Sequence, residues 1–224
     1  MFIVLEGLDG AGKSTQMRLL QNYLTRNDIL SELLHFPRFD TPVFGELIAK
    51  FLRGDLGDIQ TVSPYIVGLL FAGDRNDAAN IIRNWLKEGK CVVLDRYVHS
   101  NIAYQCAKLP PAERQTLRQW ILQMEYDYFG IPQPDLTLFL DVPLSHVEQK
   151  LTAQRQGEDR SYLQGKKDIH EASLNLQEQV RAVYLEQSTQ DNKFHIVNCG
   201  DGVRILPAEI IFKKIQTHII SLIS

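Results

Sequence analysis

Short apolar runs alternate along the chain with longer stretches whose apolar positions recur every three or four residues. Runs of four or five residues, rich in β-branched or large apolar side chains, predict buried strands. There are five of them: Phe2–Leu5, Leu33–Phe36, Cys91–Leu94, Leu136–Leu140 and Phe194–Val197. Because the strands alternate with helical patterns, the sequence predicts an α/β domain, with a parallel sheet between layers of helices.

Capping residues mark several of the helices. One helix is expected to begin at Ser63-Pro64, where serine is the N-cap and proline the first helical residue, and to end at Gly89. Another is expected from Pro110-Pro111 to Gly130. The last begins near Pro207 and places four apolar residues on one face, namely Ile211, Ile215, Ile219 and Leu222.

A polar, charged and weakly periodic stretch lies at about 154–170, between two helical patterns. We expect it to be a mobile insertion and not a second domain. The whole chain of 224 residues is then a single domain with one insertion.

The composition of the chain mainly excludes certain classes of protein. With 24 Lys+Arg against 27 Asp+Glu, the net charge of −3 argues against a nucleic-acid partner. Three scattered cysteines favour neither disulfides nor a zinc site. The N-terminus does not resemble a signal peptide, and charges interrupt the apolar stretch 206–223, which excludes a membrane span. We therefore expect a soluble, cytoplasmic protein.

A phosphate-binding motif directly follows the first predicted strand. Residues 7–14, GLDGAGKS, fit the pattern G-x-x-x-x-G-K-[ST]. The glycines let the backbone N–H groups converge on an anion at the start of a helix. Lys13 is expected to reach the β- and γ-phosphates, and Ser14 to bind Mg²⁺. The predicted nucleotide-binding set is Gly7, Leu8, Asp9, Gly10, Ala11, Gly12, Lys13, Ser14 and Thr15.

A nucleotide site alone allows either a phosphotransferase or a nucleotide-driven switch. A GTP switch needs a guanine-reading N-K-x-D, but Asn192-Lys193 continues with Phe194-His195. The only D-x-x-G outside the phosphate-binding loop, from Asp127 to Gly130, ends a helical pattern instead of following a strand. Both absences favour the phosphotransferase.

The end of the third strand suggests a family. Asp95 occupies the place where nucleotide-binding sheets hold Mg²⁺, although a strand-end aspartate can also cap a turn. Then come Asp95-Arg96-Tyr97, Ser100-Asn101 and Ala103-Tyr104-Gln105. Together with the Asp9 in the phosphate-binding loop, this run resembles the thymidylate kinases, a family of P-loop nucleoside monophosphate kinases. Further matches between residue 1 and about residue 197 are Phe36-Pro37-Arg38, Leu69-Leu70-Phe71, Arg75, Pro134-Asp135-Leu136 and Phe139-Leu140.

The resemblance implies a three-layer P-loop kinase fold with a five-stranded parallel sheet and a mobile lid. It also implies Mg²⁺-dependent transfer of the ATP γ-phosphate to dTMP, giving dTDP and ADP, and a homodimer. The alternatives are a kinase of dUMP, CMP or UMP, and a nucleotide-binding protein without catalysis.

The same resemblance assigns roles to single residues. Asp9 would accept a hydrogen bond from the 3′-hydroxyl, while Arg38 and Arg96 would hold the acceptor phosphate. Phe71 would stack on thymine and Arg75 would donate to a base carbonyl. The remaining substrate contacts would come from Phe36 and Pro37, from Ser100 and Asn101 at the base edge, from Tyr104 against C2′, and from Gln105 and His170.

Each assignment has a purely structural alternative. Phe71 could be a core residue, and Arg75 could pair with Asp74 on a solvated helix face. Ser100 and Asn101 could be helix caps, and Pro37 could merely end a strand. Only their joint occurrence at the family spacing favours a site.

The lid must supply basic groups, because Gly10 occupies the loop position where some members of the family carry arginine. Arg155 and Arg160 are the candidates, with Lys166 and Lys167 behind them. In Asp168-Ile169-His170-Glu171, His170 stands where the family usually has tyrosine. The predicted catalytic set is Lys13, Arg96, Arg155, Arg160 and Asp9. No general base is required, since a monophosphate is mostly dianionic at neutral pH.

Overall fold

The sheet is built from five parallel strands in the order β2-β3-β1-β4-β5. The computed structural model describes residues 1–224 except 58–60, 153–161, 165–167, 169–173, 203 and 224. All five predicted strands are confirmed, with ends that differ by one or two residues. Their bounds are β1 Phe2–Gly7, β2 Ser31–His35, β3 Cys91–Asp95, β4 Leu136–Asp141 and β5 Phe194–Asn198.

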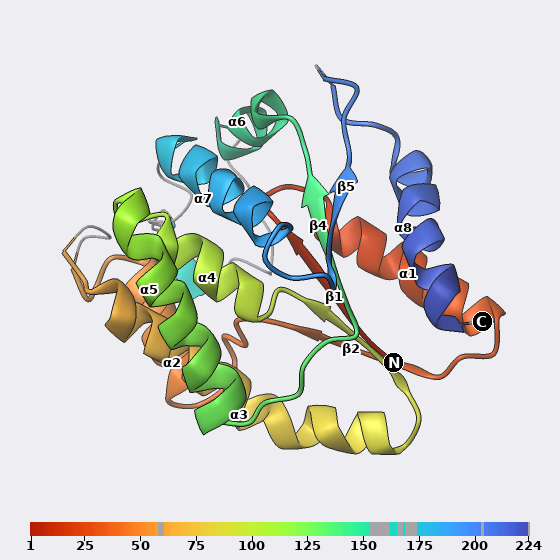
Figure 1. Ribbon diagram of the computed structural model, residues 1–224, viewed down its shortest axis with the longest axis horizontal. Helices are drawn as coiled ribbons and strands as arrows, with labels where there is room; N and C mark the ends of the chain where they lie inside the picture. Colours follow the sequence, from red (N-terminus) through yellow and green to blue (C-terminus); the bar gives the residue numbers. More distant parts are fainter. Residues whose placement is uncertain (58–60, 153–161, 165–167, 169–173, 203, 224) are drawn as a thin grey trace.

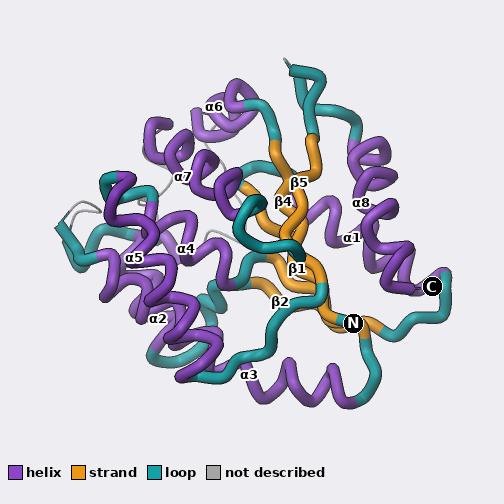
Figure 2. The backbone as a smooth tube through the Cα atoms, viewed as in Figure 1, coloured by secondary structure: helices purple, strands orange, loops and turns teal. Residues whose placement is uncertain are grey.

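Helices cover both faces of the sheet, as Figures 1 and 2 show. Helices α1 and α8 pack together on one face, while α4 contacts β1 on the other and is flanked by α3, α5 and α7. The predicted α/β architecture is therefore confirmed. The helices are α1 Lys13–Arg26, α2 Phe44–Leu52, α3 Pro64–Lys87, α4 Val98–Cys106, α5 Pro111–Leu122, α6 Leu144–Thr152, α7 Leu174–Gln187 and α8 Ala208–Ile223.

The helix predicted from Pro110-Pro111 to Gly130 is not α-helical throughout. Helix α5 continues as a π-helix, η1 Gln123–Tyr128, and the N–H of Phe129 then bonds to the carbonyl of Met124 at 2.9 Å. The wider turns bury the carboxyl group of Glu125 completely, against α3 and α4. Such π segments often occur at functional sites.

The other predicted helices differ only in detail. Helix α3 has the predicted bounds within two residues. In α8, Ile211, Ile215 and Ile219 are buried, but Leu222 is 39% exposed because it lies beyond the sheet, close to the end of the chain. Helices α2 and α4 were not predicted from the apolar pattern. Among the described residues, no helix has both the length and the apolar character needed to cross a bilayer.

Most of the predicted lid lies outside the described residues. Of the stretch 154–170, the structure describes Tyr162 to Gln164 and Asp168. The ring of Tyr162 stacks on Phe39 with 3.6 Å between centroids, and its hydroxyl donates to Asp168 Oδ2 at 2.8 Å. The mobility of the insertion and the single-domain organisation of 1–224 stay predictions.

Strand register brings polar residues together at one edge of the sheet. Asp95, at the carboxyl end of β3, is in register with His35 of β2 and with Leu5 of β1. The phosphate-binding loop begins where β1 ends. Parallel α/β sheets bind ligands at this edge, outside the carboxyl ends of the strands.

Packing between α2 and α3 depends on a glycine. A Cβ added at Gly73 of α3 would lie 2.2 Å from Cε1 of Phe44, whereas one added at Gly68 would meet only ordinary contacts at 3.7 Å or more. We expect Gly73→Ala to lower the free energy of unfolding by about 1–3 kcal/mol, a typical cost of overpacking. Urea denaturation measures it. Gly68→Ala is the matched control, and equal stability of the two variants would contradict the prediction.

Candidate functional site

The phosphate-binding loop lies between β1 and α1, with the predicted strand before it and helix after it. Gly12 precedes the helix at φ 84°, a left-handed conformation that favours glycine. Nζ of Lys13 donates to the carbonyl oxygens of Gly7 and Leu8, each at 3.2 Å. Burial and the nearby Arg96 lower the pKa of Lys13. An anion bound in the loop would raise the pKa of Lys13 again and stabilise its charged form. The loop is therefore suited to bind an anion.

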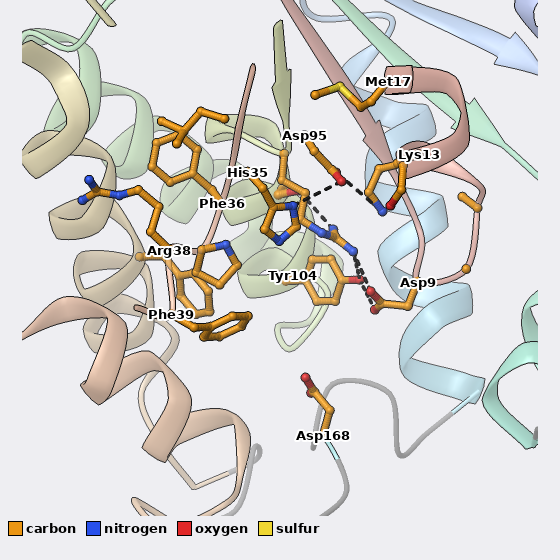
Figure 3. A pocket seen from close by; sticks show the side chains of 18 of the residues that line it. Asp9, Lys13, Met17, His35, Phe36, Arg38, Phe39, Asp95, Tyr104 and Asp168 are labelled. Carbon is orange, nitrogen blue, oxygen red and sulfur yellow. Dashed lines mark hydrogen bonds and ion pairs between the residues drawn. The ribbon is translucent and has the colours of Figure 1, made fainter. Parts of the chain in front are cut away.

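Asp95 faces Lys13 across the end of the sheet. Its Oδ1 lies 3.9 Å from Lys13 Nζ, and its Oδ2 lies 3.2 Å from Nδ1 of His35 (Figure 3). Burial opposes ionisation, but Lys13, His35 and Arg96 together lower the pKa of Asp95. Oδ1 is buried and accepts no hydrogen bond within the described residues. A carboxylate oxygen that accepts no hydrogen bond, beside the phosphate-binding loop, fits a magnesium ion or its water shell.

Arg96 connects the end of β3 to the phosphate-binding loop. Its backbone is left-handed at φ 68°, a conformation that non-glycine residues adopt only where their surroundings fix it. Its Nη2 donates to Asp9 Oδ1 at 2.7 Å, and its Nη1 donates to Ser100 Oγ at 3.2 Å. The hydroxyl of Tyr104 donates to Asp9 Oδ2 at 2.7 Å. Asp9, Arg96 and Tyr104 are thus in direct contact.

A buried carboxylate behind this cluster was missed in the sequence. Glu6 of β1 is fully buried and accepts hydrogen bonds from the backbone N–H groups of Tyr97 and Ser100, from Ser100 Oγ and from the Tyr184 hydroxyl. The one available signal was a glutamate inside a buried apolar strand. The hydroxyl of Ser100 was expected to face the base edge. In the structure it forms hydrogen bonds with Glu6, Tyr184 and Arg96.

Helix α7 also reaches the cluster. Gln177 Nε2 donates to Asp9 Oδ2 at 3.3 Å, and Tyr184 lies two helical turns further on the same face. Both residues are fully buried. Polar residues seven positions apart were a weak signal, because the same spacing is common on solvated helix faces.

A second group of predicted residues lies between α3, α4 and η1. Arg75 donates through Nε and Nη2 to the two carboxylate oxygens of Glu125. Asn101 Nδ2 donates to the Gly68 carbonyl and to Glu125 Oε1, both at 2.9 Å. Arg75 is buried, so the alternative of a solvated pair with Asp74 is wrong.

Asp74 instead binds Arg38. Its Oδ1 accepts from Arg38 Nε at 2.8 Å, and its Oδ2 accepts from the Arg38 backbone N–H at 2.9 Å. Arg38 Nη2 reaches Asp77 at 2.6 Å. The guanidinium of Arg38 is therefore engaged by α3 in this structure.

One cavity of about 1290 Å³ joins these groups. This exceeds the volume usual for one small ligand, so the cavity has room for two. The predicted residues that line it are Asp9, Gly10, Ala11, Gly12, Lys13, Ser14, Thr15, Phe36, Pro37, Arg38, Phe71, Arg75, Asp95, Arg96, Ser100, Asn101, Tyr104 and Gln105.

The other predicted residues are placed differently. Gly7 and Leu8 contribute carbonyl groups beneath the loop, while Arg155, Arg160, Lys166, Lys167 and His170 lie outside the described residues. Lining residues that the sequence did not predict include Met17, His35 and Phe39, which Figure 3 labels. Arg18, His146, Lys150 and Tyr162 also line the cavity. Asp168, seen only as part of the lid pattern, also lines the cavity.

The parallel sheet, the phosphate-binding loop and the shared cavity define a P-loop nucleotide-binding protein with room for a second ligand. The thymidylate kinase family profile matches residues 5–210. A thymidylate kinase of Mycobacterium tuberculosis is 32% identical over 85% of this chain and 86% of its own length. A probable thymidylate kinase of Pyrococcus abyssi is 32% identical over 94% and 93%.

A solved structure agrees with the sequence matches. The thymidylate kinase of Candida albicans superposes with a TM-score of 0.73 at 28% identity, covering 99% of this chain and 91% of its own. The chain belongs to the thymidylate kinase family.

The contacts of Glu6 lead to a stability prediction. Glu6→Gln places an amide N–H₂ among hydrogen-bond donors, so we expect the free energy of unfolding to fall by about 1–3 kcal/mol. Tyr184→Phe removes only one of the donors and is expected to cost less. Urea denaturation of both variants tests this, and a Glu6→Gln protein as stable as the parent would contradict it.

Proposed function

We propose that this chain transfers the γ-phosphoryl group of ATP to dTMP, giving dTDP and ADP, on the route to dTTP. The observation that carries the proposal is the single cavity that runs from Lys13 in the phosphate-binding loop to Arg96, Asn101 and Tyr104. Family membership supports the same acceptor. The kinases of dUMP, CMP or UMP and the non-catalytic nucleotide binder are not favoured.

ATP would occupy the loop side of the cavity. Lys13 would bind the β- and γ-phosphates, and the loop N–H groups would surround them. Ser14 and Asp95 would hold Mg²⁺, which neutralises developing charge on the phosphates when bound. Two observations support this assignment: the side chain of Ser14 is exposed, and Asp95 Oδ1 accepts no hydrogen bond within the described residues.

The acceptor phosphate would bind at Arg96. Burial disfavours its charge, yet Tyr104, Asp9 and other groups raise the pKa of Arg96 well above its ordinary value, so the guanidinium stays charged. Arg38 would join it by exchanging Asp77, which is 58% exposed, for the phosphate. Two fixed guanidinium groups lower the repulsion between donor and acceptor, and the phosphate dianion itself attacks without a general base.

The nucleoside of dTMP would extend toward α3 and α4. We assign Phe71 to stacking on the base, and Arg75 and Asn101 to its polar edge. Asp9 and Tyr104 would contact the sugar, with Tyr104 excluding a 2′-hydroxyl. Phe36, Pro37 and Gln105 would complete the pocket. Asn101 Oδ1 is buried and has no hydrogen-bond partner in the described part of the chain, which supports a hydrogen-bonding ligand there.

The remaining assignments lie outside the described residues or outside one chain. Arg155, Arg160 and His170 would close over ATP as part of the lid. Exposed apolar side chains support a homodimer through α2 and α3: Val43 directly before α2, Leu47 within it, and Ile66 and Leu69 on α3. Three free, buried cysteines support a cytoplasmic location.

An ADP-release assay over dTMP, dUMP, dGMP, CMP and UMP tests the substrate. We expect dTMP to give the highest kcat/KM, since the pocket offers fixed partners to a pyrimidine base and crowds the sugar. If another monophosphate exceeds dTMP, the thymidylate assignment is wrong. If none releases ADP above the rate without acceptor, the kinase itself is excluded.

Loss of the two central cations should abolish most turnover. We expect Lys13→Ala and Arg96→Ala each to reduce kcat/KM for dTMP by about 10² to 10³, the usual loss when one charge-stabilising donor is removed. Lys87→Ala and Arg26→Ala, at exposed helix ends, are the matched controls. Circular dichroism checks that the variants fold. Near-parental turnover in a folded Lys13→Ala or Arg96→Ala protein would refute the assigned role.

A further inference from the structure

We propose that Lys108 is a positioning residue for the base pocket: it fixes the amide of Gln105 so that Nε2 faces the bound base. This makes Gln105 a donor that selects bases with a 4-carbonyl group over bases with a 4-amino group. The inference rests on the proposed function, because it concerns how the same pocket chooses its acceptor.

The direction of the Gln105 amide follows from simple chemistry. Lys108, just beyond the end of α4, places Nζ 2.8 Å from Gln105 Oε1. Below its pKa of about 7, Lys108 is an ammonium group with three donors and no acceptor, so the amide atom that it contacts is then the oxygen. The amide N–H₂ then points away from Lys108. Within the described residues Nε2 has no hydrogen-bond partner, although Gln105 is only 1% exposed and lines the cavity.

The ammonium group of Lys108 does not lie in the solvent, as that of a surface lysine usually does. Its ammonium lies 5.1 Å from the centroid of the Phe51 ring, and Phe51 packs edge-on against Phe71 at 6.4 Å. Burial lowers the pKa of Lys108 to about 7. Among the described residues no carboxylate pairs with it. Its one described hydrogen bond, to Gln105, is therefore its main polar compensation.

Gln105 and Asn101 are one helical turn apart on the face of α4 that meets α3. Both lie beside Gly68: Gln105 Cγ is 3.7 Å and Asn101 Oδ1 is 3.8 Å from the position of a Cβ there. Asn101 donates its N–H₂ to Gly68 and Glu125, and among the residues that the structure describes no donor reaches its buried Oδ1. This face of α4 thus presents one acceptor, Asn101 Oδ1, and one donor, Gln105 Nε2. Gly68 and Glu125 orient the first amide, and Lys108 orients the second.

That pair is complementary to uracil and thymine. Their edge carries an N3–H donor beside carbonyl acceptors, whereas cytosine carries an N3 acceptor beside a 4-amino donor. A buried donor or acceptor left without its partner costs more than the bond gains when it forms. A freely rotating Gln105 could satisfy either base. Because Lys108 fixes the orientation of the Gln105 amide, the amide favours uracil or thymine over cytosine.

Binding of dUMP and dCMP isolates this effect, because the two nucleotides differ only at the base edge. The dissociation constants of both, measured by calorimetry, give a preference for dUMP. We expect Lys108→Met to weaken dUMP binding and to reduce this preference by about tenfold. Lys108→Arg keeps a donor and should retain the preference within about threefold. Lys87→Met, at the exposed end of α3, is the matched control.

A double mutant assigns the effect to Gln105. If Lys108 acts through the amide, Lys108→Met should cause no further loss of preference in a Gln105→Leu background. An unchanged dUMP affinity and preference in Lys108→Met, or an equal further loss in the double mutant, would overturn the proposal. The activity of the unmutated protein on dTMP tests the proposed function separately. If that protein does not phosphorylate dTMP, the proposed function is refuted, whatever the variants show.

Discussion

The carboxylate of Glu6 holds the active-site side of the molecule together. It lies in the central strand of the sheet, and its hydrogen bonds reach the start of α4 and the last turn of α7. A carboxyl group buried in this position is tolerable because it accepts several hydrogen bonds. Through Ser100, the same network reaches Arg96. Elements separated by most of the chain are therefore aligned by one side chain.

The charges of the site are balanced before any substrate arrives. Asp9 holds Arg96, and Asp74 with Asp77 holds Arg38. These pairs keep the guanidinium groups oriented and lower the cost of burying them. An incoming phosphate has to compete with carboxylates that already bind the same cations. The pairing therefore orients the cations at some cost in affinity for the phosphate.

The sequence was sufficient to predict the sheet, since five apolar runs between helical patterns allow few other arrangements. It also identified the phosphate-binding loop, whose chemistry is local. It was insufficient wherever a partner lies far along the chain. Glu6 is only a polar residue in a strand until Tyr184 is beside it, and Arg75 is only a helix-face arginine until the π-helix brings Glu125 to it. Resemblance to a family supplied roles for such residues, but not the contacts that fix them.

The π-helix has a consequence for the evolution of this chain. A π segment contains more residues per turn than the α-helix it interrupts. Deleting one residue from 123–128 would let the segment close into α-helical turns, which would move the residues of the wide turn relative to α3 and α4. Glu125 would then leave Arg75 and Asn101. Natural length variation should therefore avoid this short stretch, although the surface loops around it can lengthen or shorten freely.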